Sequence, residues 1–157
     1  MITKVISGGQ TGADQAGIYA AAQMKIPTGG TMPKGYKVIN GYDEEFAKIY
    51  GLEESHSDKY PPRTIKNVID SDGTIRFASN FNSAGERCTL KAIHMKGKPY
   101  FDVNVVNFPE HKEVVKWIKE NNIKVLNIAG NSEKSSPGIT SFVVNYLLIV
   151  FKLLGKE

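Results

Sequence analysis

A group of glycine and polar residues near the amino terminus has the composition of an anion-binding loop. The residues are Gly8, Gly9, Gln10, Thr11 and Gly12, which we call the glycine loop, and a helix is expected to follow them directly. Glycines let the backbone approach a phosphate closely, and the Gln10 amide and the Thr11 hydroxyl can donate hydrogen bonds to its oxygens. Backbone N–H groups at a helix N-terminus favour anions as well. A tight turn without a ligand would need fewer such residues, so we interpret the glycine loop as a phosphate site.

The spacing of these residues differs from the two commonest nucleotide motifs. A dinucleotide-binding GxGxxG motif would require glycine in place of Gln10 and Ala13, and a P-loop would require lysine near Asp14. No acidic residue occurs between Gln15 and Tyr42, the region in which a dinucleotide-binding fold places its ribose-binding carboxylate. The sequence therefore disfavours both NAD and nucleoside triphosphates as ligands.

Asp14 is the first carboxylate after the glycine loop, and its role is open at this stage. It stands in the first turn of the expected helix, where the helix dipole stabilises a negative charge. The same charge would repel a phosphate bound at that end of the helix. N-terminal capping is therefore one interpretation, and contact with a sugar hydroxyl, a metal or a base nitrogen is the other.

Polar and basic residues also follow the other expected strands. Ligands of open parallel sheets bind beyond the carboxyl ends of the strands, so these residues are candidates for the same site. Lys34, Arg63 and Thr64 can contact an anion, with a solvated lysine and a surface salt bridge of the arginine as close alternatives. The candidates in loops that precede later helices are Ser83, Gly85, Gly130, Asn131 and Ser132.

The histidine, serine and cysteine residues form no metal-binding or hydrolytic pattern. His56, His94 and His111 are scattered, with neither a close histidine pair nor a cysteine neighbour, so we expect no metal site. A serine hydrolase is disfavoured because the chain has no G-x-S-x-G motif. The single cysteine, Cys88, cannot form an internal disulfide, and the amino terminus lacks the apolar run of a secretory signal. We therefore expect a cytoplasmic protein.

Short apolar or β-branched runs alternate with helical patterns along the chain. Strands are expected over residues 3–7, 26–31, 74–78, 100–103 and 124–129, and helices over residues 13–24, 43–49, 63–70, 84–96, 110–121 and 139–154. Residues 33–62 hold the short second helix and are otherwise expected to form a long functional loop. The alternation predicts a Rossmann-like, doubly wound α/β fold, with a mainly parallel sheet of about five strands and helices on both faces. At 157 residues the chain is expected to be a single domain, residues 1–157.

Charge and hydropathy exclude several classes of partner. With 20 Lys and Arg against 16 Asp and Glu the formal net charge is +4, and without a block of like charge we expect no binding to nucleic acid. The most apolar stretch, residues 142–154, is interrupted by Asn145 and Lys152 and is too short to span a bilayer, so no membrane association is expected. This stretch is apolar around nearly its whole helical circumference, and from this we expect a homo-oligomer.

Segments from nearly the whole chain carry a family resemblance. They are residues 6–16, 30–35, 63–64, 67–68, 70–72, 74, 126–130 and 135–139. In these segments the chain resembles the molybdenum carrier proteins, which belong to the Rossmann-like SLOG superfamily. The resemblance implies that the glycine loop, Lys34, Arg63, Thr64 and the loop at Gly130 surround an anionic ligand. In the carriers that ligand is molybdenum cofactor, a phosphate-bearing pterin (molybdopterin).

Two functions follow from these residues and from the resemblance. The favoured one is a binding or carrier protein for a small, anionic, phosphate-bearing and nucleotide-like molecule, either a nucleotide or molybdopterin. The alternative draws on members of the superfamily that resemble phosphoribohydrolases, which cleave a base from ribose 5-phosphate with a carboxylate near the sugar. For that reaction Asp14 and Glu86 are the candidate catalytic residues. The sequence points to no cofactor apart from such a bound ligand.

Overall fold

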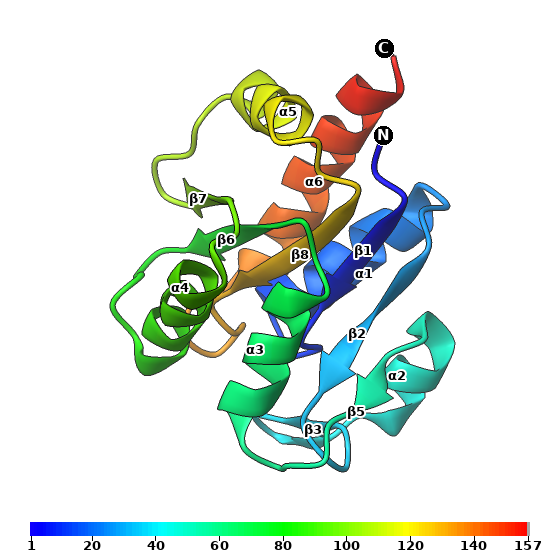
Figure 1. The fold of residues 1–157 in the computed structure, drawn as a ribbon, viewed down its shortest axis with the longest axis vertical. Helices are drawn as coiled ribbons and strands as arrows, with labels where there is room; N and C mark the ends of the chain where they lie inside the picture. Colours follow the sequence, from blue (N-terminus) through cyan, green and yellow to red (C-terminus); the bar gives the residue numbers. More distant parts are fainter. Residues whose placement is uncertain (157) are drawn as a thin grey trace.

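Six parallel strands form one sheet, and helices cover both of its faces (Figure 1). The computed structural model describes residues 1–156. The strands of the sheet span Lys4–Ser7 (β1), Thr28–Met32 (β2), Glu53–Glu54 (β5), Gly73–Ala78 (β6), Tyr100–Asn104 (β7) and Val125–Gly130 (β8). Their order across the sheet is β5-β2-β1-β8-β6-β7, and every neighbouring pair is parallel. The last strand of the chain therefore lies in the middle of the sheet.

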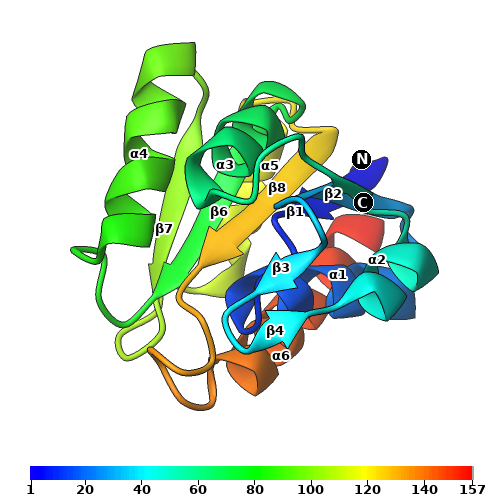
Figure 2. The ribbon, with the colours of Figure 1, turned by 90° about the horizontal axis from the view of Figure 1, so that it is seen from below.

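The helices divide between the two faces of the sheet. They span Ala13–Gln23 (α1), Glu44–Tyr50 (α2), Tyr60–Ile69 (α3), Ala84–Lys96 (α4), His111–Glu120 (α5) and Ile139–Gly155 (α6). α1 and α5 both pack against α6 on one face, and α3 and α4 pack together on the other, in front of the sheet in Figure 1. α2 packs beside β2. A separate hairpin of Lys37–Val38 (β3) and Gly41–Tyr42 (β4) stands apart from the main sheet in Figure 2.

The two faces of the central strands differ in polarity. Leu126 and Ile128 of β8 are fully buried in the apolar core that includes residues of α1, α5 and α6. Successive side chains of a strand point to opposite faces, so Asn127 between them points towards α3 and α4. Thr74 bonds to Asn127, and it likewise alternates with the apolar core residue Ile75. The sheet thus presents buried polar groups to α3 and α4, and this polar face supports the candidate site.

The doubly wound α/β architecture is confirmed, with one more strand than predicted. The sheet has six strands rather than about five, because β5 pairs with β2 inside the stretch predicted as a long loop. Its sequence, Glu53–Glu54, has no β-branched or aromatic residue, so only the pairing with β2 makes it a strand. α3 also begins earlier than predicted, at Tyr60, because Pro61 and Pro62 lie within its first turn.

The apolar sequence of α6 has an explanation inside the molecule. Val143, Leu147 and Val150 are fully buried, and the helix packs against α1 and α5 at the same time. Ile149 is 44% exposed. Burial against two helices therefore accounts for much of the apolar pattern, and homo-oligomerisation stays a prediction. Over residues 1–156, no helix combines the length and apolar character that crossing a membrane requires.

Candidate functional site

A cavity of about 390 Å³ lies where the chain leaves β1, β6 and β8. Because the strands are parallel, the loops that follow them meet at the same edge of the sheet. The first turn of α3, the first turns of α4 and Ile39 from the hairpin complete the wall. The residues that line the cavity are Gln10, Asp14, Ile39, Tyr60, Pro61, Arg63, Thr64, Ser83, Ala84, Gly85, Glu86, Cys88, Thr89, Ala129, Gly130, Asn131, Ser132 and Ser135.

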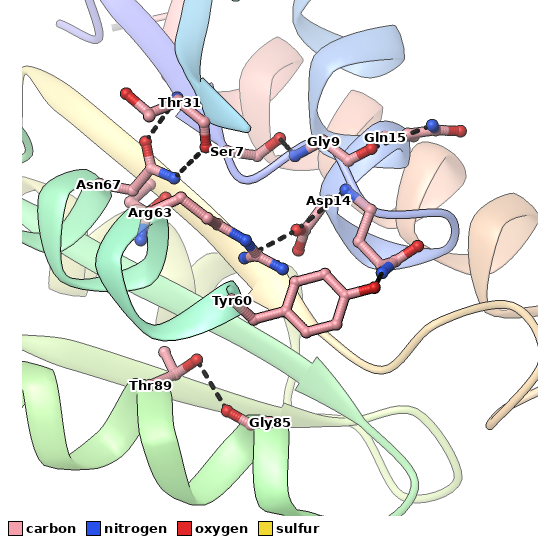
Figure 3. A network of polar contacts seen from close by, with 12 residues as sticks. Ser7, Gly9, Asp14, Gln15, Thr31, Tyr60, Arg63, Asn67, Gly85 and Thr89 are labelled. Atoms are coloured by element: carbon pink, nitrogen blue, oxygen red, sulfur yellow. Dashed lines mark hydrogen bonds and ion pairs between the residues drawn. The ribbon is translucent and has the colours of Figure 1, made fainter. Parts of the chain in front are cut away.

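Asp14 and Arg63 form an ion pair in the wall of this cavity. Asp14 Oδ2 lies 3.6 Å from Arg63 Nη1 and accepts a hydrogen bond of 3.2 Å from the backbone N–H of Gln10. In Figure 3 Arg63 reaches from α3 towards Asp14, with the ring of Tyr60 beside it. Burial raises the pKa of Asp14 from 3.8 to about 6, against the lowering effects of Arg63 and the Gln10 N–H. The Asp14 carboxyl group therefore changes between its protonated and its ionised form close to neutral pH.

Glu86 is the second carboxyl group of the cavity. Its Oε2 accepts hydrogen bonds from Asn131 Nδ2 at 3.2 Å and from Ser83 Oγ at 3.4 Å. Burial, and after it the charge of Asp14, raise the pKa of Glu86 to about 6, although its polar neighbours lower it. Two acid groups of one cavity therefore titrate in the same range and influence each other.

Arg76 fixes the segment that carries Glu86. It is 2% exposed, and its Nε and Nη2 each donate a hydrogen bond of 2.7 Å to a carboxylate oxygen of Asp102. Its Nη1 donates to the backbone carbonyl of Glu86 at 3.0 Å. The rings of Phe81 and Tyr100 lie 5.0 and 5.7 Å from the guanidinium carbon. The first turn of α4 is thereby tied to β6 and β7.

The Gln10 side chain joins three segments of the cavity wall. Its Oε1 accepts hydrogen bonds from the backbone N–H groups of Thr11 at 3.0 Å and Ile39 at 2.9 Å. Its Nε2 donates to the hydroxyl of Tyr60 at 3.3 Å. The glycine loop, the hairpin and the start of α3 therefore share one amide, which keeps one of its two N–H groups for a ligand.

None of the three glycines of the glycine loop leaves room for a Cβ, and a Cβ at Gly9, which has a φ of 71°, would overlap the Met32 side chain. A Cβ at Gly8 would overlap the guanidinium of Arg63. Gly12 has a φ of 91°, and its Cβ would overlap the backbone carbonyl of Asn131. Gly85 is different, because nothing lies within 4 Å of a Cβ at that position. Gly85 leaves open space in the cavity, whereas Gly8 and Gly12 let neighbouring segments approach.

The structure brings most of the predicted site residues into one cavity wall. The predicted residues that line it are Gln10, Asp14, Arg63, Thr64, Ser83, Gly85, Glu86, Gly130, Asn131 and Ser132. Among the described residues, Gly9, Thr11, Gly12 and Lys34 lie outside this lining, and Gly8 lines a smaller cavity beside it. Lys34 is exposed, and its backbone N–H donates to the carbonyl of Ser57 at 2.8 Å.

Sequence reasoning missed several residues of the wall. Cys88 and Thr89 lie one turn after Gly85 on α4, so helical spacing from Gly85 is the signal that would have found them. Tyr60 had a weaker signal, as the residue before the two prolines that open α3. Ile39 had none, because its place depends on the distant bond to Gln10.

Metal-ligating residues are not clustered at this site. Within residues 1–156, no group of three or more His, Cys, Asp or Glu side chains is placed to hold a metal ion. Burial raises the pKa of the Cys88 thiol, so the sulfur stays protonated at neutral pH. The functional groups of the wall are therefore two carboxyls, one guanidinium, a phenol, one thiol, and several hydroxyl and amide groups.

Comparison with known proteins matches nearly the whole chain. The model of the circularly permutated YpsA SLOG family matches residues 5–151, which include every residue of the cavity wall. A crystal structure of a protein from Syntrophus aciditrophicus SB, named "putative molybdenum carrier protein", has a TM-score of 0.85 and 33% sequence identity. The match covers 95% of this chain and 94% of that chain. Among curated proteins the comparison found no match.

Proposed function

Because the chain belongs to the circularly permutated YpsA SLOG family, we propose that it binds a phosphate-bearing, nucleotide-like small molecule in the cavity at the carboxyl edge of its sheet. The observation that carries this proposal is the composition of the cavity wall. The wall combines hydroxyl and backbone N–H donors with two carboxyl groups and an aromatic ring. A phosphate needs the first set, and a nitrogen heterocycle needs the second. The volume of about 390 Å³ is typical of small-molecule sites.

A serine hydroxyl and the first turn of α4 supply donors for a phosphate. Ser83, Ser132 and Ser135 line the cavity. The Ser83 hydroxyl donates to Glu86 Oε2 and the Ser132 hydroxyl to Ser135 Oγ, so the Ser135 hydroxyl is the one of the three whose proton can be donated to a phosphate without breaking either bond. α4 is 13 residues long, so its N-terminal N–H groups and its dipole favour an anion at this end. The open space at Gly85 admits a phosphate close to the backbone.

Asp14 and Tyr60 supply contacts for a nitrogen heterocycle. A carboxyl group with a pKa of about 6 accepts hydrogen bonds from ring N–H or amino groups when ionised and donates one when protonated. The Tyr60 ring and Ile39 offer apolar surface beside this group. Arg63, 5.2 Å from the Tyr60 ring centroid, is the basic residue of the described wall.

Two sources share this ligand chemistry, namely nucleoside monophosphates and pterin phosphates. Both carry a phosphate and a flat heterocycle with N–H and amino donors, and the wall fits both. The name of the Syntrophus protein supports a molybdenum-bearing cargo, and the pterin phosphate of molybdenum cofactor is a cargo of that kind.

Isothermal titration calorimetry with matched ligands and variants tests the proposal. The ligands are adenosine and guanosine 5′-monophosphate, oxidised molybdopterin, and adenosine as the control without phosphate. Gly85→Leu fills the cavity, and Gly155→Leu at the end of α6 is the control, since its Cβ position is equally unobstructed. We expect at least one phosphate ligand to bind, with about tenfold or greater loss for Gly85→Leu and no loss for Gly155→Leu. The proposal would be overturned if no phosphate ligand binds, or if Gly85→Leu binds the ligand as tightly as the wild type does.

The presence of two carboxyl groups, Asp14 and Glu86, in one cavity wall favours a second candidate, hydrolysis of a nucleoside 5′-monophosphate. Water adds to the anomeric carbon of the sugar, the bond to the base nitrogen breaks, and a proton passes to the base. The products are the free base and ribose 5-phosphate. Two carboxyls with pKa values of about 6 suit this reaction, because one can act as the acid while the other stays ionised.

Chromatography of the free base tests hydrolysis separately from binding. Nucleoside monophosphates are incubated with the wild-type protein, Asp14→Asn and Glu86→Gln. Release of base by the wild type, reduced about a hundredfold or more in both variants, is the expected result for this candidate. Bound nucleotide recovered intact would exclude hydrolysis and leave the binding proposal in place.

A further inference from the structure

A second, much smaller cavity shares Asp14 and Arg63 with the large one. Its volume is about 10 Å³, the space of a single water molecule. Its wall also includes Thr64, Thr89 and Asn127, so it lies between α1, α3, α4 and the central strand β8. Figure 3 shows Asp14, Arg63 and Thr89 around this part of the molecule.

Two buried polar atoms of residues in this wall have no hydrogen-bond partner among residues 1–156. They are Arg63 Nε and Asn127 Oδ1. Asn127 is 3% exposed, and its Nδ2 donates to Thr74 Oγ1 at 3.1 Å, so Oδ1 is the atom of the amide that lacks a partner. Buried polar atoms in folded proteins are normally bonded either to protein or to ordered water. Each of these atoms therefore needs a hydrogen-bonding partner, and the small cavity that both residues line offers space for one.

We propose that the small cavity binds one internal water molecule that bridges Arg63 Nε and Asn127 Oδ1. The Nε–H is a donor and Oδ1 is an acceptor, so a water that accepts from the first and donates to the second satisfies both atoms. Thr89 gives the second water proton an acceptor, because the Thr89 hydroxyl proton is donated to the Gly85 carbonyl at 3.1 Å. Three partners are the usual number for a buried water.

Other occupants of the small cavity are disfavoured by charge and by size. The Arg63 guanidinium lines it and repels a cation, and the Asp14 carboxylate lines it and repels an anion. A volume of about 10 Å³ excludes any larger neutral molecule. A single water is the neutral group that both donates and accepts at this size.

The bridging water makes Asn127 a positioning residue for the large cavity. Arg63 Nη1 lies 3.6 Å from Asp14 Oδ2, a contact that leaves the guanidinium orientation loosely fixed. A second tether through the water to β8 holds the Arg63 plane against Asp14 and Tyr60. The inference uses protein groups alone, so it stands whichever ligand the large cavity binds.

Crystal structures of the wild type and two variants test this water site. Asn127→Leu removes the acceptor Oδ1, and Thr74→Val removes the bond to Nδ2 while Oδ1 stays in place. We expect a water peak about 2.7 to 3.2 Å from both Arg63 Nε and Asn127 Oδ1 in the wild type and in Thr74→Val. We expect that peak to be missing in Asn127→Leu. A wild-type cavity without water, or a direct bond between the two atoms, would overturn the proposal.

Proton exchange of the Arg63 Nε–H, followed by NMR, provides a readout in solution. A water-bridged Nε–H exchanges slowly with solvent, and we expect exchange about tenfold faster in Asn127→Leu but unchanged in Thr74→Val. Asn127→Asp keeps the acceptor oxygen and is expected to restore slow exchange. Equal exchange rates in the wild type and in Asn127→Leu would contradict the bridge. If Asn127→Leu fails to fold, the electron density of the wild type and of Thr74→Val still tests whether the water is bound.

Discussion

Asp14 Oδ2 lies 3.6 Å from Arg63 Nη1, so a carboxylate in the first turn of α1 is paired with a guanidinium near the start of α3. The pair spans two helices on opposite faces of the sheet. Its partial burial has consequences for stability and for ligand binding that can be measured. The pKa of Asp14 remains about 6 despite the arginine, because desolvation by burial outweighs the attraction.

The raised pKa of Asp14 predicts that stability falls as the pH rises from 3.8 to about 6. In this pH window the folded state binds more protons than the unfolded state. The stabilisation that protonated Asp14 contributes is therefore complete below pH 3.8 and is lost above about pH 6. The shift corresponds to a free energy of unfolding on the order of 3 kcal/mol. Urea titrations at about pH 4 and about pH 7 should show a larger decrease for the wild type than for Asp14→Asn.

Comparison with Asp14→Asn reduces the contribution of the other titrating groups to this measurement. Glu86 contributes in the same direction as Asp14, whereas His111, with a pKa lowered by burial, contributes in the opposite one. His111 is present in both proteins, so its effect cancels in the difference. The part of the Glu86 shift that comes from the Asp14 charge is lost in Asp14→Asn, and it adds to the difference in the same direction. Identical pH profiles of the two proteins would contradict the prediction.

Glu86→Gln is predicted to strengthen the binding of a nucleoside monophosphate at neutral pH by about threefold to tenfold. The substitution removes a negative charge from the wall and keeps an acceptor for Asn131 and Ser83. At about pH 5 the wild-type Glu86 is mostly protonated, so the difference should nearly disappear. Calorimetric titration at both pH values measures it, and the second ionisation of the phosphate affects both proteins alike. Weaker binding by the variant at neutral pH would speak against a phosphate near Glu86.

Asp102→Ala is predicted to lower the free energy of unfolding by about 3 kcal/mol, because it leaves the buried Arg76 guanidinium unpaired. Arg76 has a side chain 3% exposed and loses two hydrogen bonds of 2.7 Å. Glu120→Ala is the matched control, since its pair with Lys116 has side chains 62% and 74% exposed. For the control we expect the free energy of unfolding to fall by less than about 0.5 kcal/mol, as measured by urea unfolding. Similar losses for both variants would contradict this account of Arg76.

Gly12→Ala is predicted to destabilise the protein by about 2 kcal/mol or more, through a φ of 91° and overlap with the Asn131 carbonyl. Gly85→Ala is predicted to be neutral or to stabilise it by up to about 1 kcal/mol, because it lies in a helix with free space around it. Thermal unfolding of the two variants compares them directly. A neutral Gly12→Ala would show that the glycine loop tolerates a side chain at this position.

The exposed side of α6 leads us to predict a homo-oligomer in solution. Ile149 is 44% exposed, and the apolar residues Val144 and Leu148 of the same helix are only partly buried. Light scattering of the wild type should give a mass above that of one chain, and Ile149→Glu should lower it, because a charge opposes burial of this surface. A monomeric wild type would refute the prediction.

The sequence predicts those parts of the fold in which local pattern and tertiary contact agree. Val5 and Ile6 before the glycine loop, and the alanines after it, define a strand and a helix by their own preferences. Asp14, Arg63 and Gly130 meet because the carboxyl ends of parallel strands share one edge. For these three residues, the order of strands and helices along the chain is sufficient to predict that they lie close together.

The rest of the site depends on contacts that no local pattern encodes. Gln10 reaches Ile39 and Tyr60 across 29 and 50 residues, and these bonds decide which loop residues enter the wall. Gly8 and Gly12 have the composition of a phosphate loop, yet their neighbours Arg63 and Asn131 are what exclude a side chain there. Only the assembled structure separates a glycine that admits a ligand from one that admits another part of the chain.

β8 joins two halves of the sheet that are synthesised long before it. Lys4 of β1 pairs with Val125 of β8, and β8 also pairs with β6, so β1 and β6 are not neighbours without it. Contacts of such long sequence separation slow folding, and we expect the amides of β1 and β6 to become protected together in pulsed hydrogen exchange. On the ribosome, the cavity remains incomplete until the segment of β8 and the loop after it have emerged from the exit tunnel.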